Sequence, residues 1–387
     1  MQLADSKVEV FVVGAGPVGL SLTAELRRIG VSALLIDQHD EGAQTSRACV
    51  IHARTLEVLE SIGVTQQLLS VGVKVPIFRI RDRDHMLLTI DFSQIASRYA
   101  FTLMYPQDRT ERLLMDALER LGGSVHRGVA FAGFEAQEPE IVATLNDNGN
   151  RTVVKTQWLV GCDGMHSTVR EQAGIPFEGA AYEQGFILAD VGMSWPLTRE
   201  EVTLFYSPRG LMVVAPLPED RFRIVATDDA APEVPSQEYV QSVLDERGPV
   251  ADAARIRDIA WSSRFRIHHR VAATSRRGRV LLCGDAAHVH SPAGGQGMNT
   301  GIQDAMSLAP VLAEVLAGGG EATLDKWASD RHRIARDVVS MTDRLTRMAT
   351  LKSPVGQSLR NAAVALLGHV PPVRAAVARR LAELDAR

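Results

Sequence analysis

The feature that most constrains this chain lies near its start, where a short apolar run gives way to the segment Gly14-Ala15-Gly16-Pro17-Val18-Gly19. Residues 8–13 are rich in valine, as in a buried strand, and residues 20–29 have the apolar spacing of a helix. A second apolar run follows at residues 33–36. A strand, a helix and a second strand in this order predict a βαβ unit with parallel strands, and therefore an α/β fold.

The glycine-rich segment predicts a dinucleotide site of Rossmann type. Glycines permit a tight turn and let the backbone approach a pyrophosphate, whose charge is favoured by the N-terminus of the following helix. Asp37 ends the second strand 18 positions after Gly19, near the spacing at which a carboxylate binds a ribose, and Gln38 follows it. An acid there disfavours a 2′-phosphate. The sequence therefore favours FAD or NAD over NADP as the nucleotide held at this turn.

The composition restricts the class of partner. A length of 387 residues allows two to three domains, and 42 basic against 46 acidic residues leave no excess positive charge for nucleic acid. Three cysteines that are far apart, without a C-x-x-C pair, argue against a disulfide or zinc framework and favour a reducing, cytoplasmic setting. The first apolar run is too short for a signal peptide or a membrane span. We expect no integral membrane association.

The histidines do not predict a metal site. The four histidines considered are His268, His269, His288 and His290. No cysteine or carboxylate near them completes a known spacing of metal ligands, and His288 is expected to hydrogen-bond locally.

The middle of the chain changes in character. Residues 54–62 and 110–121 have helical spacing, whereas residues 74–90 alternate like a hairpin. Between residues 186 and 227, four short β-rich runs separated by turn residues predict a mostly antiparallel sheet. A buried strand at residues 280–283 and a helix from about Thr300 then resume the first pattern.

These patterns predict three parts: a Rossmann-like nucleotide-binding domain, an interleaved antiparallel substrate-binding domain and C-terminal helices. The C-terminal part includes a basic amphipathic stretch, residues 373–384, for which we expect a solvated helix packed on its own domain. The expected boundaries are 1–73, 100–180 and 272–330 for the nucleotide-binding domain, 74–99 and 181–271 for the substrate-binding domain, and 331–387 for the helical region.

Two later segments favour FAD over NAD. Cys162-Asp163-Gly164 and Gly284-Asp285-Ala286 each place Gly and Asp where a strand gives way to a loop. The second is followed by a glycine-rich run, residues 291–299, that leads into a helix. Such a helix N-terminus presents backbone N–H groups to a phosphate or to an electron-rich flavin ring. A simple dehydrogenase needs neither segment.

With three motifs in this order, residues 8–351 resemble the class A FAD-dependent aromatic hydroxylases. This family includes para-hydroxybenzoate and phenol hydroxylases, and the hydroxylases that tailor aromatic polyketides. The resemblance implies that FAD is bound without a covalent bond, that NAD(P)H and O₂ are co-substrates and that the flavin carries the chemistry. It implies reduction of the flavin, formation of a flavin hydroperoxide and transfer of its distal oxygen to a ring carbon, in a site from which water is excluded.

The resemblance also implies a set of cofactor contacts. The first glycines would hold the pyrophosphate, Asp37 the ribose, and Asp285 the ribityl chain and pyrophosphate. Arg170 is associated with both FAD and the reduced nicotinamide, and residues 295–299 with the isoalloxazine ring. The expected contacts are Gly14, Gly16, Pro17, Gly19, Asp37, Gln38, Arg47, Gln107, Asp163, Gly164, Arg170, Gly284, Asp285, Gly295, Gly297, Met298 and Asn299.

Substrate contacts are expected at the interface between the two domains. Tyr206, Met212 and Arg223 lie on the antiparallel strands, where a shift of one residue reverses the face, and Pro292 resembles a proline that faces the substrate. No Ser-x-Arg pair of the kind that holds a benzoate carboxylate is present at residues 211–216. A bulky or polycyclic aromatic substrate is therefore favoured, and no catalytic side chain is assigned.

Two alternatives stay open. Baeyer–Villiger or epoxidising oxygenation on the same fold would use the same motifs, whereas halogenation is disfavoured because no two tryptophans are two residues apart. A FAD-containing accessory protein that does not turn over would bind the cofactor but show no substrate-stimulated oxidation of NAD(P)H. The sequence leaves the choice between NADPH and NADH, the identity of the substrate and the oligomeric state open.

Overall fold

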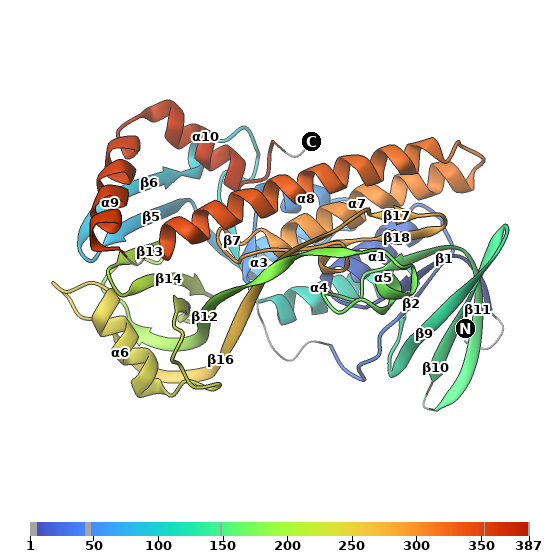
Figure 1. The fold of residues 1–387 in the computed structure, drawn as a ribbon, viewed down its shortest axis with the longest axis horizontal. Coiled ribbons are helices and arrows are strands. Elements are labelled where there is room, and N and C mark those ends of the chain that lie inside the picture. Colours follow the sequence, from blue (N-terminus) through green and yellow to red (C-terminus); the bar gives the residue numbers. More distant parts are fainter. Residues whose placement is uncertain (1–5, 43–47, 148, 352, 386–387) are drawn as a thin grey trace.

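A computed structural model describes residues 6–42, 48–147, 149–351 and 353–385. It is a mixed α/β fold whose strands form two large sheets and one small sheet (Figure 1). Among the described residues, no helix combines the length and the apolar character that crossing a membrane requires.

The first sheet contains the predicted βαβ unit. β1 (Ser6–Val13) pairs in parallel with β2 (Ala33–Ile36), and α1 (Pro17–Arg28) connects them, which confirms the prediction. On its other side β1 pairs in parallel with β11 (Asn150–Gly161), which pairs in parallel with β18 (Val280–Leu282). The other strands of this sheet are β8 (Val125–His126), β9 (Val129–Gln137), β10 (Glu140–Asp147) and β17 (Arg276–Arg277).

The second sheet is mostly antiparallel, as predicted. Its order is β19-β16-β12-β15-β14-β13-β5-β6. The predicted hairpin is present, with its turn at Arg83, whose φ is 55°. Its first strand pairs in parallel with β13, so an early segment completes a sheet that is built mainly from the middle of the chain. The bounds are β5 (Ile77–Asp82), β6 (His85–Asp91), β12 (Phe177–Ser194), β13 (Glu201–Ser207), β14 (Gly210–Leu217), β15 (Arg221–Thr227), β16 (Arg255–Ala272) and β19 (His288–Val289).

The third sheet is small and joins segments that flank the hairpin. It has the order β3-β7-β4, with β3 (Val50–Ile51), β7 (Thr102–Met104) and β4 (Val73–Val75). Residue 74 therefore belongs to this sheet and not to the hairpin. The expected division into domains stays a prediction.

Helices cover both large sheets. Figure 1 shows α7 and α8 side by side along the molecule, α9 and α10 beside β5 and β6, and α6 next to the second sheet. The remaining bounds are α2 (Ala53–Val58), α3 (Thr65–Val71), α4 (Gln107–Arg120), α5 (Thr168–Gln172), α6 (Gln237–Arg247), α7 (Gly297–Leu316), α8 (Ala322–Ala349), α9 (Pro354–Gly368) and α10 (Pro371–Leu381), with short 3₁₀ turns η1 (Phe92–Gln94) and η2 (Gly284–Ala286).

Three helix ends differ from the sequence expectation. α2 ends at Val58 and not near residue 62. α4 begins at Gln107, directly after Pro106, whose extended backbone ends the preceding loop. α7 begins at Gly297 and not near Thr300, because the glycine run continues into the first turn of the helix. Helix ends are the least certain part of a pattern-based prediction, and these shifts do not change the order of elements.

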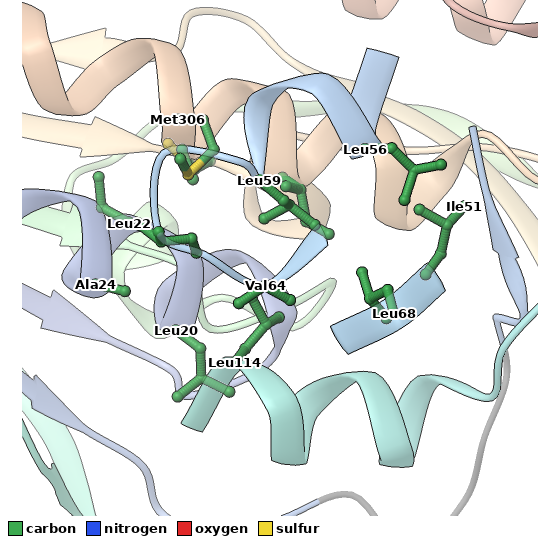
Figure 2. Packing of buried hydrophobic residues seen from close by; sticks show 14 of the residues in the cluster. Leu20, Leu22, Ala24, Ile51, Leu56, Leu59, Val64, Leu68, Leu114 and Met306 are labelled. Carbon is green, nitrogen blue, oxygen red and sulfur yellow. The ribbon is translucent and has the colours of Figure 1, made fainter. Parts of the chain in front are cut away.

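The largest apolar core lies on one face of the first sheet. Leucines on more than one side of α1 belong to one buried cluster with residues of α2, α4 and α7, and Figure 2 labels Leu20, Leu22, Leu56, Leu114 and Met306 of this cluster. A second cluster covers the opposite face of this sheet, and a third lies between the second sheet and α6. The parallel strands are thus buried on both faces, which leaves their ends as the place for a ligand.

Candidate functional site

Four strand ends meet at one edge of the first sheet. Because β18, β11, β1 and β2 are adjacent and parallel, the loops that follow them emerge side by side. Hydrogen bonds join the loops across the edge: Cys162 N donates to Val13 O at 2.8 Å, and Cys283 N donates to Gly161 O at 3.0 Å. The motifs that the sequence separates by more than a hundred residues therefore form one surface.

The first glycine turn depends on missing side chains. Gly14 has φ +100°, and a Cβ there would lie 2.4 Å from Cys162 O. At Gly19 a Cβ would lie 1.9 Å from Gly14 O, so α1 can approach the turn only with glycine at that position. Gly16 is different, because its Cβ would meet nothing within 4 Å. Gly14 and Gly19 thus shape the turn, whereas Gly16 leaves open space beside the N-terminus of α1.

Asp37 lies next to this turn, as a nucleotide site requires. Ala15 N donates to Asp37 Oδ2 at 2.7 Å, and His39 N donates to Asp37 Oδ1 at 2.9 Å. These bonds fix the carboxylate beside the glycines while leaving further lone pairs on its oxygens. Gln38 is exposed at the same strand end.

The segment after β11 is held by its own side chains. Ser167 Oγ donates to Asp163 Oδ1 at 2.6 Å, and Val169 N donates to Asp163 Oδ2 at 3.1 Å. Burial raises the pKa of Asp163 above its ordinary value, and these hydrogen bonds oppose the shift. Gly164, with φ +79°, has open space where a Cβ would be. Asp163 thus orders the loop and Gly164 leaves room beside it.

Arg170 connects the loop that follows β11 with the loop that follows β18. Its guanidinium is buried and donates to Met165 O at 2.9 Å and to Ala286 O at 3.0 Å. It also lies over the ring of Phe177, with 3.9 Å between Cζ and the ring centroid. The structure therefore gives Arg170 the geometry of a positioning residue that joins the loops after β11 and β18. A direct contact with FAD or nicotinamide stays a prediction.

A buried charge cluster supports the loop after β18. Gly284 N donates to Asp304 Oδ2 at 3.1 Å, His288 Nε2 lies 2.7 Å from the same oxygen, and Arg331 Nε donates to Asp304 Oδ1 at 2.5 Å. Burial alone would raise the pKa of Asp304, but Arg331 and His288 hold it below its ordinary value. The expected hydrogen bond of His288 is thus present, but with a helix residue 16 positions away. Asp285 itself is exposed at the edge.

The loop before α7, residues 290–296, is tied to β3. Asn299 Nδ2 donates to Val50 O at 2.8 Å and to Gly295 O at 2.7 Å, while His52 N donates to Asn299 Oδ1 at 2.8 Å. The Asn299 side chain is therefore occupied by protein partners. It fixes the position of the loop, and the backbone N–H groups of the first turn of α7, Gly297 and Met298 among them, stay without helical acceptors.

His52 was not anticipated from the sequence. It is fully buried, its Nε2 lies 2.7 Å from Gly294 O, and burial lowers its pKa to about 4. The residue is neutral at physiological pH, and because Nε2 faces a carbonyl oxygen we assign the proton to that nitrogen. No local pattern identifies it, because its partners lie more than 240 positions further along the chain.

Two further expected contacts lie at the start of this region. Gln107 Oε1 accepts from Ala48 N at 3.2 Å, and Gln107 Nε2 donates to Glu111 Oε1 at 3.0 Å. Gln107 therefore anchors the residue next to Arg47. Arg47 itself lies outside the described residues, and its predicted contact with FAD cannot be placed.

The edge is compatible with a dinucleotide cofactor. Open space lies at Gly16 and Gly164, the N-terminus of α1 faces the turn, and a carboxylate stands at the end of β2. The α1 N-cap is Gly16 with Pro17 next to it, and neither supplies a capping side chain, so the first N–H groups of α1 are available to a phosphate. This edge therefore fits a dinucleotide such as FAD sterically and electrostatically, and the individual contacts stay predictions.

The second sheet has two distinct faces, and the face on which a residue lies determines what its side chain can contact. One face packs on α6 and contains Met212, Val214 and Ile224. The other, which we call the inner face, carries Val213 and Ala215, which pack against the core of the first sheet. Met212 is fully buried on the α6 side and not on the inner face, and its predicted contact with the substrate stays a prediction. Strand alternation places it opposite to its neighbours.

Arg223 lies on the inner face but is paired. Its Nε and Nη2 each donate to Asp190 at 2.8 Å, and Trp261 Nε1 donates to the same carboxylate at 3.0 Å. Arg223 is 1% exposed, and the thiol of Cys49 lies within hydrogen-bonding reach. Since Cys49 directly precedes β3, this network joins the second sheet to the segment that holds the pre-α7 loop.

The other substrate candidates have different surroundings. Tyr206 is buried, and the guanidinium of Arg360 from α9 lies 4.5 Å from its ring centroid. C-terminal helices thus cover Tyr206, and its predicted substrate contact would require them to move. Pro292 is exposed in the pre-α7 loop, and its predicted contact with the substrate stays a prediction.

Comparisons with known proteins agree with this geometry. A family model described as an FAD binding domain matches residues 7–342. The chain is 36% identical over 382 residues to a 6-methylpretetramide 4-monooxygenase from Streptomyces rimosus, which covers 96% of this chain and 68% of the relative. The structure of an anhydrotetracycline hydroxylase from Streptomyces rimosus matches with a TM-score of 0.82 at 32% identity, covering 98% of this chain and 77% of that chain.

One relative has a name of another kind. The chain is 32% identical over 356 residues to a dialkyldecalin synthase from Streptomyces rugosporus, covering 90% of this chain and 74% of the relative. Proteins similar to this chain therefore include at least one that is named as a synthase and not as a monooxygenase.

The match to the family model spans most of the chain, so the chain belongs to the FAD-binding domain family. Within that family it is a flavoprotein monooxygenase of the aromatic hydroxylase type, with FAD as cofactor and NAD(P)H and O₂ as co-substrates. The sequence-based resemblance and the predicted fold class are confirmed.

Proposed function

We propose that this monooxygenase hydroxylates a bulky, polycyclic aromatic small molecule bound between the pre-α7 loop and the inner face of the second sheet. The observation that carries this proposal is the pairing of Arg223 with Asp190. The charge of this guanidinium is balanced by Asp190 and its side chain is buried, so it is poorly placed to bind a second carboxylate from a substrate. The inner face around it is apolar, with Val213 and Ala215 as neighbours on β14. An uncharged ring system suits such a surface.

The names of the relatives support the same substrate class. The 6-methylpretetramide 4-monooxygenase and the anhydrotetracycline hydroxylase are both named for polycyclic substrates. We extend that class to this chain, together with a cytoplasmic setting and a small molecule as its partner. The expected FAD contacts and the three-part domain division belong to the same proposal.

In this proposal the protein supplies position and exclusion of water. Bound FAD supplies the redox chemistry that passes electrons from NAD(P)H to O₂. The loops after β1, β11 and β18 hold the nucleotide, and Asn299 keeps the pre-α7 loop against β3. The apolar inner face keeps bulk water from the reacting ring, which favours oxygen insertion over release of peroxide.

The test is anaerobic reduction of the FAD-loaded protein by NADPH and by NADH, with and without a panel of polycyclic phenols. We expect one phenol to accelerate flavin reduction by orders of magnitude and, after addition of O₂, to gain one oxygen atom. Simple benzoates serve as the control and should not accelerate reduction. Acceleration by benzoates alone would contradict the proposed substrate class, and an insertion that gives an ester or an epoxide would favour the alternative oxygenations.

A second candidate function is that of an accessory protein that binds FAD but does not turn over. The observation that favours it is the similarity to a dialkyldecalin synthase. If the flavin stays oxidised with both nucleotides and every phenol, a role of bound FAD without turnover gains support. The same reduction experiment therefore separates the two functions.

A further inference from the structure

The chain segment that follows α10, residues 381–384, packs behind the pre-α7 loop. Leu381, Ala382 and Leu384 are buried in the largest apolar core, and Glu383 between them is also buried, at 5% exposed. Glu383 has φ 61°, a left-handed conformation that ends α10 and turns its side chain toward α7. An acidic residue is seldom buried without a specific partner. Neither the cofactor site nor the proposed reaction accounts for this one.

Backbone carbonyls of this segment hold the loop and α2 directly. Gln296, within the loop, donates from Nε2 to Leu381 O at 3.1 Å, and Arg54 N in α2 donates to Ala382 O at 3.3 Å. A Cβ on Gly294 would lie 3.2 Å from Leu381 Cδ2, so the loop packs closely on the segment. α2 and the pre-α7 loop thus rest on the same few residues.

The Glu383 carboxyl completes these contacts. Its Oε1 lies 3.1 Å from Thr300 Oγ1, and Gln303 Nε2 donates to Oε2. Gln303 Nε2 also lies 3.2 Å from Thr55 Oγ1 in α2. Glu383 therefore touches the first two turns of α7 and reaches α2 through Gln303.

Counting protons at Thr300 indicates the form of the carboxyl. Thr300 Oγ1 has one hydrogen, and two oxygens lie in reach: Gln296 O at 3.0 Å and Glu383 Oε1 at 3.1 Å. A protonated Glu383 can donate to Thr300 while Thr300 donates to Gln296. That arrangement makes one hydrogen bond more than a carboxylate allows.

The electrostatic surroundings agree with the proton count. Burial raises the pKa of Glu383 to about 8, although Thr300, Gln303 and Arg331 favour the charged form. Asp304 opposes ionisation from α7. His52, on the far side of the loop, has a pKa of about 4 and is therefore already neutral where Glu383 ionises, so it adds no titration there.

We propose that Glu383 is a positioning residue that clamps the pre-α7 loop and the first turns of α7 against α2, and thereby fixes the flavin ring and keeps water from it. The clamp acts through Thr300 and Gln303, and its carboxyl touches neither cofactor nor substrate. It rests on the assignment of the FAD site and does not depend on which substrate is oxidised.

The test compares Glu383→Ala and Glu383→Gln with Asp385→Asn as the matched control. Asp385 lies two positions further along, is exposed and pairs with Arg379, so its loss should leave the loop unchanged. Hydrogen exchange of the FAD-loaded protein should speed up by about tenfold in residues 294–303 for Glu383→Ala, because a buried hydrogen-bond partner is lost. The FAD dissociation constant should rise by a similar factor, roughly tenfold. Glu383→Gln can still accept from Gln303 and donate to Thr300, so it should behave like the parent protein.

A pH series provides the second arm. Between pH 7 and pH 9 the parent protein should lose protection in residues 294–303 as Glu383 ionises, whereas Glu383→Gln should not. Equal exchange in Glu383→Ala and Asp385→Asn would overturn the proposal, as would an identical pH response of the parent protein and Glu383→Gln. If Glu383→Ala does not fold, the comparison of the parent protein with Glu383→Gln still decides. Because neither readout needs a substrate, failure of the clamp is distinguishable from failure of the proposed hydroxylation.

Discussion

The cofactor edge of the first sheet and the inner face of the second sheet are built in different ways. At the cofactor edge the backbone does most of the work of shaping the site, and glycines are required because any side chain would collide. On the inner face, side chains decide what can bind, and their direction depends on strand register. A site shaped by glycines can be recognised as a sequence motif. A site shaped by side chains depends on partners that are distant in sequence and cannot be predicted from local pattern, such as Asp190 for Arg223.

The largest expected effect separates two roles of glycine at the cofactor edge. Gly19→Ala places a Cβ 1.9 Å from Gly14 O, so it should unfold the protein or abolish its assembly around α1. Gly16→Ala meets nothing in the protein and has an ordinary φ of −73°, so the apoprotein should stay folded. Its Cβ would enter the space expected for the pyrophosphate and weaken FAD binding by roughly 100-fold, which corresponds to about 2.7 kcal/mol.

Thermal unfolding of the apoprotein and flavin absorbance per chain measure the two effects. If Gly16→Ala binds FAD like the parent protein, the pyrophosphate does not lie beside that residue. The conclusion that the backbone at the glycine turn shapes the cofactor site would then be unsupported.

The next effect probes the inner face. Arg223→Met leaves the Asp190 carboxylate buried without its main partner, which should cost about 3–5 kcal/mol of unfolding free energy. Arg221→Met is the matched control, two residues earlier on the same strand. Arg221 pairs with Asp258 at the surface, and such a pair contributes about 0–1 kcal/mol.

Urea unfolding of both variants gives the comparison. Equal losses would mean that the Arg223–Asp190 pair is not a buried structural unit, and Arg223 would return as a candidate for substrate binding. A large loss for Arg223→Met alone supports the apolar substrate class.

A smaller effect tests the assignment of the two faces. Met212→Ala creates a cavity under α6 and should cost roughly 2–4 kcal/mol, but it should leave substrate-stimulated flavin reduction unchanged. Val213→Ala, one residue further on β14, is half-buried on the inner face and should cost about 1 kcal/mol or less while changing the response to substrate. The opposite pattern would show that the faces have been exchanged.

Much of the fold was predictable because its signals are local. The βαβ unit, the hairpin around Arg83 and the antiparallel strands follow from apolar period and turn residues within a few positions. The meeting of three distant motifs also followed, since parallel strands bring their ends to one edge. Helix ends shifted by a few residues where glycine or proline stood at the boundary.

The contacts that support the site were not predictable from local pattern. The side chain of Asn299 bridges Val50 and Gly295, a contact that no local pattern predicts, and no sequence motif indicated His52. The face that Met212 occupies was also left open, because alternation along a strand fixes two sets of residues but does not say which set faces inward. Partners that lie 80 to 250 positions apart are set by tertiary packing. Those of Glu383 lie about 80 positions away, and those of Asn299 on β3 and at His52 lie almost 250 positions away.

The smallest expected effect shows whether the cofactor edge also depends on a side chain. Glu383 has a pKa of about 8 in the folded protein, against 4.5 as its ordinary value. The folded state therefore binds more protons than the unfolded state between these values, so the unfolding free energy of the parent protein should fall as pH rises from about 5 to 8. Glu383→Gln cannot titrate, so its unfolding free energy should lack this dependence on pH. Each pKa unit corresponds to about 1.36 kcal/mol, but the segment can detach locally once the carboxylate is charged, so we expect a difference of only about 2 kcal/mol.

Urea unfolding of the two proteins at pH 5, 6, 7 and 8 measures this difference, with Asp385→Asn as the control that keeps Glu383. If the parent protein and Glu383→Gln show parallel pH profiles, Glu383 is ionised in the folded state and the carboxyl is held by charge alone. If the profiles diverge but loop exchange does not change, the buried acid acts on stability without acting on the loop. Divergence in both would mean that Glu383, a distant side chain, helps to hold the pre-α7 loop beside the cofactor edge, in addition to the side chains that support the edge itself.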